Sequence, residues 1–395
     1  MPSAAPAETA RAIAQALTGL LCLLAAVSIV AGQARPRARD IGLEPGPLAT
    51  GPLNAITDVA GVKVGQVTLV RGDTVRTGVT AVLPHGGNLF REKVPGAVFV
   101  GNAFGKLAGS TQVQELGTIE SPIVLTNTLA VGTAVEATVR WTLAQPGNGD
   151  VRSVNALVGE TNDGGLNDIR ALPVTREDEQ RAIVDATGGP VEEGAVGAGT
   201  GTIAFGWKGG IGSSSRLVGG DGARWTVGAL VQSNYGGRLT MGGVPIWRLL
   251  PASRAAAYAA LAPSADGSCM IVMATDAPLT AKDLERLAAR ALFALARTGS
   301  TYSNGSGDYA IAFSTHPAVR VRSDGRAVPQ PRAVLMTDAV SDLFAAAMDA
   351  TEEAVYNSLL RASDTTANGR TVKALPVDDV RRLVERSRAS FIDAR

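Results

Sequence analysis

The chain contains very little histidine and cysteine. Its 395 residues include two histidines, His85 and His316, and two cysteines, Cys22 and Cys269. Two histidines exclude a metal centre with three or more histidine ligands, and the cysteines form no cluster of the kind that binds zinc. A serine–histidine–aspartate triad would have only two candidate bases. We therefore expect no metal and no cofactor, and we consider bases other than histidine.

Aromatic residues and charge of one sign are also scarce. Aromatic residues make up 4% of the chain, and 37 basic against 36 acidic residues give a net charge of +1 without long runs of one sign. Nucleic-acid binding depends on a basic surface and often on aromatic stacking, so we expect no nucleic-acid partner. No run of 18 apolar residues follows the N-terminal segment. The mature chain is therefore expected to have no membrane span.

The N-terminus has the pattern of a secretory signal peptide. An early arginine precedes a mostly apolar stretch over residues 16–31, and the small residues Gly32 and Ala34 occupy plausible −3 and −1 cleavage positions. The stretch is short for a stable membrane span, and an uncleaved anchor is the alternative. We predict a signal peptide over residues 1–34, a mature chain over residues 35–395, and a periplasmic or secreted location.

Strand and helix patterns are mixed along the mature chain. Val, Ile and Thr alternate with other residues over residues 54–84, which is typical of strands. Leucines and alanines recur at helical spacing over residues 280–299, between a threonine that can cap the helix and a glycine that can end it. A second helix is predicted over residues 341–363, with Glu352 and Glu353 on its solvated side. Since no linker divides the chain, we predict a single α+β domain.

The segment S-N-G-S-G-D, residues 303–308, lies directly after the first of these helices. Asparagine and glycine favour a turn between helix and strand, which is the simplest interpretation. The apolar segment that follows predicts a strand, so Ser306 would lie at the mouth of a sheet, where catalytic residues often occur. The G-S-G pattern departs from the G-x-S-x-G elbow of α/β-hydrolases. Neither His316, ten residues on, nor the distant His85 is an obvious base.

A serine can instead use its own α-amine as the base. If the bond between Gly305 and Ser306 is cut, Ser306 becomes N-terminal, and an amine with an ordinary pKa near 8 can accept the hydroxyl proton. Glycine before the serine leaves its carbonyl open to attack by the side chain. An N-to-O acyl shift followed by hydrolysis would then produce the cut.

Several stretches in a fixed order resemble the DmpA-like family of L-aminopeptidase/D-amidase-esterases and β-peptidyl aminopeptidases, which are self-processing serine peptidases. They are NAITDVAGVKVG, RTGVTAVLP, GGPVEEGAVGAGTG, WKGGIGSSSR, LVQSNYG, ATDAPL, NGSGDYAIAFST and ATEEAV. The resemblance extends roughly from Arg39 to Ala374. It implies a four-layer αββα sandwich, similar to N-terminal-nucleophile (Ntn) hydrolases but with different strand connectivity, and tetramers of two-chain units. The implied cut gives an α chain of residues 35–305 and a β chain of residues 306–395.

The resemblance also implies roles for individual residues. Ser306 would be the nucleophile in maturation and in turnover. Glu193, which matches the family's P-V-x-E-G pattern, would hold the free amino group of the substrate, a role that suits a carboxylate; a solvated loop glutamate is the alternative. A hydroxyl and a carboxylate ahead of the last long helix would assist the amine of the nucleophile. Thr337 and Asp338 fit this description, with Ser341 as a rival.

Two further positions concern stabilisation of the transition state. A tyrosine near the active site of family members aligns with Phe205, so this chain would lack one hydroxyl donor there. Asn234 is a candidate amide donor lining the site, with an ordinary turn asparagine as the alternative.

Together these features predict an exported, self-processing serine aminopeptidase. It would release N-terminal L-, D- or β-amino-acid residues from short peptides, amides or esters. One alternative is an amide hydrolase acting on ω-amino-acid (nylon-type) oligomers. Another is an acyl transferase like ornithine acetyltransferase, against which the serine nucleophile and the signal peptide count. A third is a non-catalytic exported binding protein with an intact Gly–Ser turn, which two bands on a denaturing gel would exclude.

Overall fold

The computed structural model describes residues 35–220, 223–250, 267–322 and 328–393, and residues 36–395 form one compact unit. The predicted signal peptide lies outside the described residues. Within the described part of the chain, no helix is long and apolar enough to cross a membrane.

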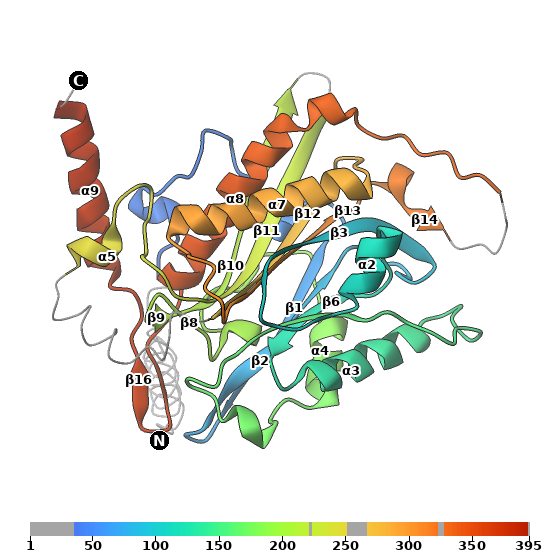
Figure 1. Cartoon of the computed structure of the whole chain (residues 1–395), viewed down its shortest axis with the longest axis horizontal. Helices are drawn as coiled ribbons and strands as arrows, with labels where there is room; N and C mark the ends of the chain where they lie inside the picture. Colours follow the sequence, from blue (N-terminus) through green and yellow to red (C-terminus); the bar gives the residue numbers. More distant parts are fainter. Residues whose placement is uncertain (1–34, 221–222, 251–266, 323–327, 394–395) are drawn as a thin grey trace, which may run out of the picture. The chain divides into compact units, whose positions relative to one another are not determined.

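Two β-sheets form the centre of this unit (Figure 1). The first sheet has the strand order β1-β2-β6-β7-β4, and the second has the order β10-β11-β12-β13-β3-β14, with β5 also paired to β3. The strands of the first sheet are β1 (Lys63–Arg71), β2 (Val75–Leu83), β6 (Ile123–Asn127), β7 (Leu157–Thr161) and β4 (Leu107–Ala108). Those of the second are β10 (Gly210–Gly220), β11 (Ala223–Asn234), β12 (Ser268–Thr275), β13 (Gly307–Ser314), β3 (Glu92–Ala103), β14 (Val321–Arg322) and β5 (Thr118–Ile119).

A pair of helices covers the outer face of each sheet. Helices α3 (Val131–Leu143) and α4 (Arg176–Val184) pack on the first sheet, and α7 (Ala281–Thr298) and α8 (Ser341–Leu360) pack on the second. Figure 1 shows the resulting order of helices, sheet, sheet and helices. The prediction of an α+β, four-layer αββα sandwich is therefore confirmed.

Further elements complete the described fold. They are the helices α2 (Ser110–Leu116), α5 (Ile246–Leu249) and α9 (Val377–Asp393), the strand pairs β8 (Ile203–Ala204) with β9 (Trp207–Lys208) and β15 (Thr365–Ala367) with β16 (Arg370–Val372), and the 3-10 turns η1 (Arg39–Ile41), η2 (Ile56–Asp58), η3 (Ile169–Ala171), η4 (Gly197–Gly199), η5 (Pro317–Val319) and η6 (Thr337–Ala339).

Helix α7 has the bounds that its sequence predicts. The Thr280 side chain accepts a hydrogen bond from the Asp283 backbone at the start, and Gly299 ends the helix with a φ of 104°. The leucines at helical spacing, such as Leu284 and Leu287, are fully buried against the second sheet. Each buried leucine contributes about 1.5–3 kcal/mol relative to an exposed one, so this apolar stripe fixes the helix on the sheet.

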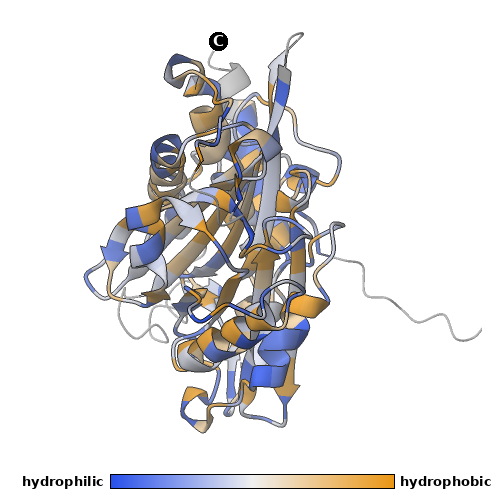
Figure 2. Ribbon diagram, turned by 90° about the vertical axis from the view of Figure 1, so that its right-hand side faces the viewer, coloured by the Kyte–Doolittle hydropathy of each residue, from blue (hydrophilic) through white to orange (hydrophobic). Residues whose placement is uncertain are grey.

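Strands β12 and β13 are parallel and buried along their whole length. On β13, Ile311 and Phe313 face the first sheet, whereas Ala310 and Ala312 face α7 and α8. Figure 2 shows hydrophobic residues along the strands of both sheets. Because both faces of this strand pair are covered, any polar side chain at its ends lies at the boundary of a dry core.

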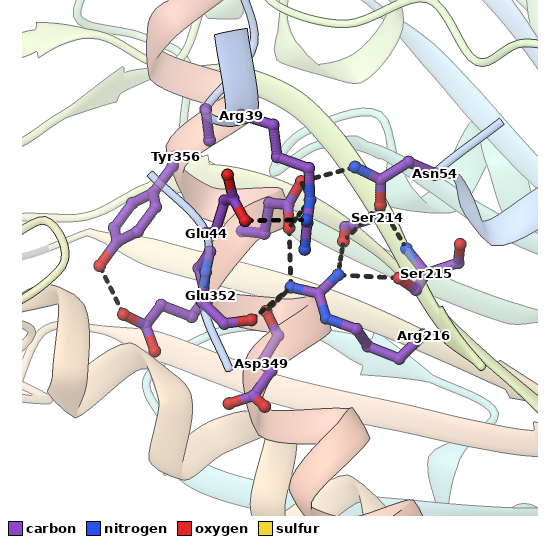
Figure 3. Close-up of polar contacts among 12 residues, drawn as sticks. Arg39, Glu44, Asn54, Ser214, Ser215, Arg216, Asp349, Glu352 and Tyr356 are labelled. Atoms are coloured by element: carbon purple, nitrogen blue, oxygen red, sulfur yellow. Dashed lines mark hydrogen bonds and ion pairs between the residues drawn. The ribbon is translucent and has the colours of Figure 1, made fainter. Parts of the chain in front are cut away.

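Glu352 and Glu353 are buried, which corrects the prediction that they lie on a solvated side of the helix. Glu353 is fully buried, and its Oε2 lies 2.7 Å from Nη2 of the equally buried Arg216. The Arg39 Nε and the Asn54 amide also donate to Glu353. Figure 3 shows this cluster around Arg216. Since its cations come from segments distant in sequence, helical periodicity could not reveal them.

The glycine-rich segment over residues 188–220 serves close backbone packing. A Cβ on Gly199 would lie 2.4 Å from the Ile211 nitrogen, which no real side chain tolerates. The buried ammonium of Lys208 donates to three carbonyls of this segment, those of Gly199, Thr202 and Gly209, at 2.8–2.9 Å. The segment is thus a closely packed stretch of backbone that joins the two sheets.

Candidate active site

Ser306 lies immediately before β13, at the N-terminal end of the central parallel strand pair. Its backbone nitrogen donates to the Ser303 carbonyl at 2.9 Å, so the segment is indeed a turn. Its carbonyl accepts from the Phe104 backbone at 3.0 Å and from the Asn102 side-chain amide. The residue is only 2% exposed. The turn therefore holds Ser306 rigidly at the mouth of the second sheet, as its sequence context predicts.

Asp308 lies two residues further along the strand and is fully buried. Neither carboxylate oxygen has a partner of hydrogen-bonding geometry among the described residues. Burial raises the pKa of Asp308 from 3.8 to about 6, and the nearby Ser306 hydroxyl and Cys269 backbone oppose part of this rise. The end of β13 thus combines a hydroxyl with an uncompensated carboxylate.

A second carboxylate reaches the same place from the first sheet. Glu160, near the C-terminal end of β7, is 2% exposed and accepts from the Lys106 backbone at 3.0 Å and from the Thr128 hydroxyl. Gly105 separates it from the serine segment, because a Cβ there would lie 3.3 Å from Glu160 Oε1 and 3.2 Å from the Gly307 Cα. Sequence reasoning missed Glu160, although an acid that ends an apolar strand pattern was a usable signal.

Glu193 does not lie beside Ser306. It accepts from the Ser213 backbone at 2.8 Å, and its Oε2 lies 2.8 Å from the Arg37 Nε. Through the strand register, Ser213 is level with Ile311, three strands away and well along β13 from Ser306. Burial raises the pKa of Glu193 and Arg37 opposes that rise. The structure thus places this carboxylate away from Ser306 and pairs it with Arg37, and its assignment to the substrate amine stays a prediction.

Thr337, Asp338 and the rival Ser341 are exposed and lie at the other end of the sheet. The nearby Leu335 backbone donates to the carbonyl of Pro278, which follows the C-terminal end of β12. Ser306 is level with the opposite, N-terminal end of the same strand. The structure does not bring these residues to the nucleophile, and their role as its helpers stays a prediction.

Asn234 and Phe205 lie at the same end of the second sheet as Ser306. Asn234 ends β11 and pairs with Ser268, which in turn pairs with Gly307. Its amide is occupied, because Nδ2 donates to the Asn162 carbonyl at 2.9 Å and Oδ1 accepts from the Ile203 backbone at 2.8 Å. Asn234 therefore contributes to this end of the sheet by holding the backbone of residues 162 and 203 in place.

The Phe205 ring packs edge-on against Tyr235, with ring centroids 4.9 Å apart. Phe205 has a φ of 53° and donates its backbone N–H to the Tyr235 carbonyl, directly after Asn234 in the chain. The residue therefore contributes an apolar surface to this edge and offers no hydroxyl. Among the residues that the structure describes, no cluster of three or more histidine, cysteine or acidic side chains could hold a metal ion.

Comparisons with known proteins give the family of the chain and its fold. Residues 54–372 match the model of peptidase family S58. The chain is 43% identical to beta-peptidyl aminopeptidase BapA of Sphingosinicella microcystinivorans over 380 residues, which cover 89% of this chain and 93% of that protein. It is 38% identical to the enzyme of the same name from Sphingosinicella xenopeptidilytica, over 96% of this chain and 98% of that one.

A solved structure shows the same fold. The L-aminopeptidase D-ala-esterase/amidase of Ochrobactrum anthropi, described as a variant of the Ntn hydrolase fold, superposes with a TM-score of 0.81 at 37% identity. The match covers 89% of this chain and 99% of that one. The two proteins thus share one fold over most of this chain. The chain belongs to peptidase family S58, and it is a hydrolase of the aminopeptidase class with the fold of an Ntn-type serine peptidase.

Proposed function

We propose that this protein is an exported, self-processing serine aminopeptidase whose nucleophile is Ser306, freed by cleavage of the Gly305–Ser306 bond. One observation carries the proposal. The serine lies at the start of the central strand, and Gly105 lies against both the next residue, Gly307, and the Glu160 carboxylate. An aminopeptidase needs these two groups, a nucleophile for the carbonyl and an anion for the free amine.

Turnover then follows from the positions of these groups. The Ser306 hydroxyl attacks the carbonyl of the N-terminal substrate residue, while the freed α-amine of Ser306 takes its proton and passes it to the leaving amine. Water hydrolyses the resulting ester by the reverse path. Glu160 holds the substrate ammonium through a charge-assisted hydrogen bond and so fixes which residue is cut. Lys106, whose Nζ lies 3.9 Å from Glu160, is more than half exposed and can move away.

Cleavage also explains how a buried serine becomes accessible. Before the cut, the turn over residues 303–306 covers Ser306, which is 2% exposed. Once the chain ends at Gly305, the hydrogen bond between Ser303 and Ser306 no longer closes a covalent loop, so this end can move away. Maturation would thereby create the nucleophile and uncover it in a single step.

The proposed substrates are short peptides, amides or esters with a free N-terminal amine on an L-, D- or β-amino-acid residue. Recognition through Glu160 depends on the ammonium and places little demand on the configuration of the neighbouring carbon. The relatives named as beta-peptidyl aminopeptidases support inclusion of β-residues. Phe104 and Leu129 are exposed beside the site and would contact small apolar side chains. Export through residues 1–34 and assembly as a tetramer remain parts of this proposal.

The test is hydrolysis of β-alanyl, D-alanyl and L-alanyl p-nitroanilides, each with its N-acetylated counterpart. We expect the wild-type protein to hydrolyse at least one free-amine substrate, and its rate on the acetylated form to be lower by about 100-fold or more. The Ser306→Ala variant should be inactive. Equal rates on free and acetylated substrates would contradict an aminopeptidase. Full activity in Ser306→Ala would contradict the nucleophile.

A further inference from the structure

The proposed maturation leaves one step without a base. Before the Gly305–Ser306 bond is cut, the nitrogen of Ser306 belongs to a peptide bond and cannot accept a proton. His316 follows the C-terminal end of β13, at the far end of the strand from Ser306. His85 bonds to the Glu92 carbonyl at the start of β3, whose other end pairs with Gly307. Neither histidine can therefore take the Ser306 proton.

Asp308 follows Ser306 by two residues and lies on β13, whereas Ser306 ends the turn just before the strand. Along this strand, Ala310 and Ala312 face α7 and α8, so the Asp308 side chain lies on that face. The Asp308 carboxylate is thus placed in an apolar layer next to the Ser306 hydroxyl, which is close enough to lower the pKa of the carboxyl. The apolar packing of β13 does not require a charged side chain at Asp308.

The titratable side chains around Asp308 offer it no charged partner. Cys269 is its neighbour on β12, and burial holds the pKa of this thiol well above its usual value. The Tyr235 hydroxyl bonds to Thr298, and the Tyr302 hydroxyl donates to the Leu292 carbonyl. Burial also raises the pKa of both phenols. The surrounding titratable groups therefore stay neutral near pH 7, and both Asp308 oxygens lack partners among the described residues.

We propose that Asp308 is the proton acceptor for Ser306 in self-cleavage of the precursor. The inference rests on the self-processing mechanism proposed above. The Ser306 hydroxyl proton moves to the Asp308 carboxylate as the Oγ forms a bond to the Gly305 carbonyl carbon. The carbon–nitrogen bond then breaks, and Asp308 returns the proton to the departing Ser306 nitrogen. Water hydrolyses the Gly305–Ser306 ester, giving a Gly305 carboxylate and a free Ser306 amine, so atoms and charges balance.

The test follows cleavage of freshly translated full-length chain by gel and intact mass, from pH 5 to pH 8. Asp308→Asn keeps the size of the side chain but cannot accept the proton, and we expect its cleavage to be at least about 100-fold slower. The matched control is Asp276→Asn, since Asp276 is another carboxylate with a burial-raised pKa, just past the opposite end of β12. It should cleave at the wild-type rate if the chain folds.

The pH profile separates proton transfer from a structural role. Because the base acts when deprotonated and the pKa of Asp308 is about 6, the wild-type rate should rise through about pH 6 and then level. Asp308→Asn should lose this inflection, and Asp308→Glu should restore part of the rate. Cleavage of Asp308→Asn within threefold of wild type would overturn the inference. Should that variant fail to fold, a flat wild-type profile between pH 5 and 8 would overturn it. An uncut wild-type chain would instead overturn the self-processing function itself.

Discussion

The two buried polar regions of the second sheet and its helices differ in how their charges are compensated. Around Arg216, the guanidinium meets the Glu353 carboxylate and several carbonyl and hydroxyl acceptors, although its Nε lacks a partner among the described residues (Figure 3). Around Ser306, the Asp308 carboxylate is equally buried and lacks a partner among the described residues. Satisfied networks fix the packing of a core, whereas an unsatisfied buried charge costs free energy and needs an explanation, such as a catalytic role. The contrast separates the structural cluster from the reactive one.

Removing an acid from the compensated region should cause the largest loss of stability. Glu353→Ala leaves the buried Arg216 guanidinium without its anion, so we expect the free energy of unfolding to fall by about 3–5 kcal/mol. Urea denaturation at neutral pH measures this change. The control is Glu285→Ala, which removes a surface ion pair with Lys282 and should cost less than about 1 kcal/mol. Similar losses in both variants would refute the structural role of the cluster.

Removing the charge of Glu160, the proposed binding group for the substrate amine, should lower activity without stopping self-cleavage. Glu160→Gln keeps the shape of the side chain but loses its charge, and we expect kcat/KM on free-amine substrates to fall by about 30- to 1000-fold, since truncating a buried charge pair costs about 2–4 kcal/mol. Cleavage at Gly305 should persist, as shown by two bands on a gel. Glu193→Gln is the matched control, because its carboxylate is remote from Ser306, and its KM should stay near that of wild type. A loss of activity in Glu193→Gln but not in Glu160→Gln would instead assign the substrate amine to Glu193.

Removing the uncompensated acid should stabilise the protein, the reverse of the effect at Glu353. The folded-state pKa of Asp308 is raised from 3.8 to about 6, so its charge destabilises the fold above pH 6 and the penalty disappears as pH falls towards 3.8. In an uncut Ser306→Ala background, Asp308→Asn should raise the free energy of unfolding by roughly 1–3 kcal/mol at pH 7.5. This gain should shrink at pH 4.5. Destabilisation at both pH values would show that the carboxylate has an unrecognised partner.

The smallest effects are expected at the exposed residues near η6. Thr337→Ala and Asp338→Asn alter side chains at the opposite end of β12 from Ser306, so cleavage and kcat should stay within twofold of wild type. Stability should change by less than about 0.5 kcal/mol, as is usual for surface substitutions. A drop of tenfold or more in kcat for either variant would restore these residues to the site.

The sequence predicted those features that local patterns encode. Helix α7 carries its own caps and apolar stripe, and the strand after Ser306 is apolar throughout, so both elements and the place of the serine followed from the text. The four-layer sandwich was predicted from the family resemblance, which rests on the order of the motifs.

Partners that meet across long stretches of chain could not be predicted in this way. Glu353 receives Arg216 from 137 residues away and Arg39 from 314 residues away. Glu160 reaches the serine segment only because the two sheets face each other, and Glu193 is paired with Arg37 from 156 residues away. Each of these contacts depends on which distant segment lies beside the acid, and this is decided by how the layers pack.

The most direct test of the account is the intact mass of the purified wild-type protein beside Ser306→Ala. We predict two chains in the wild type, the smaller beginning at Ser306 and ending at Arg395, and a single chain in the variant. A single uncut wild-type chain that still hydrolyses aminoacyl amides, or an equally cut Ser306→Ala, would contradict the claim that this serine makes itself the nucleophile.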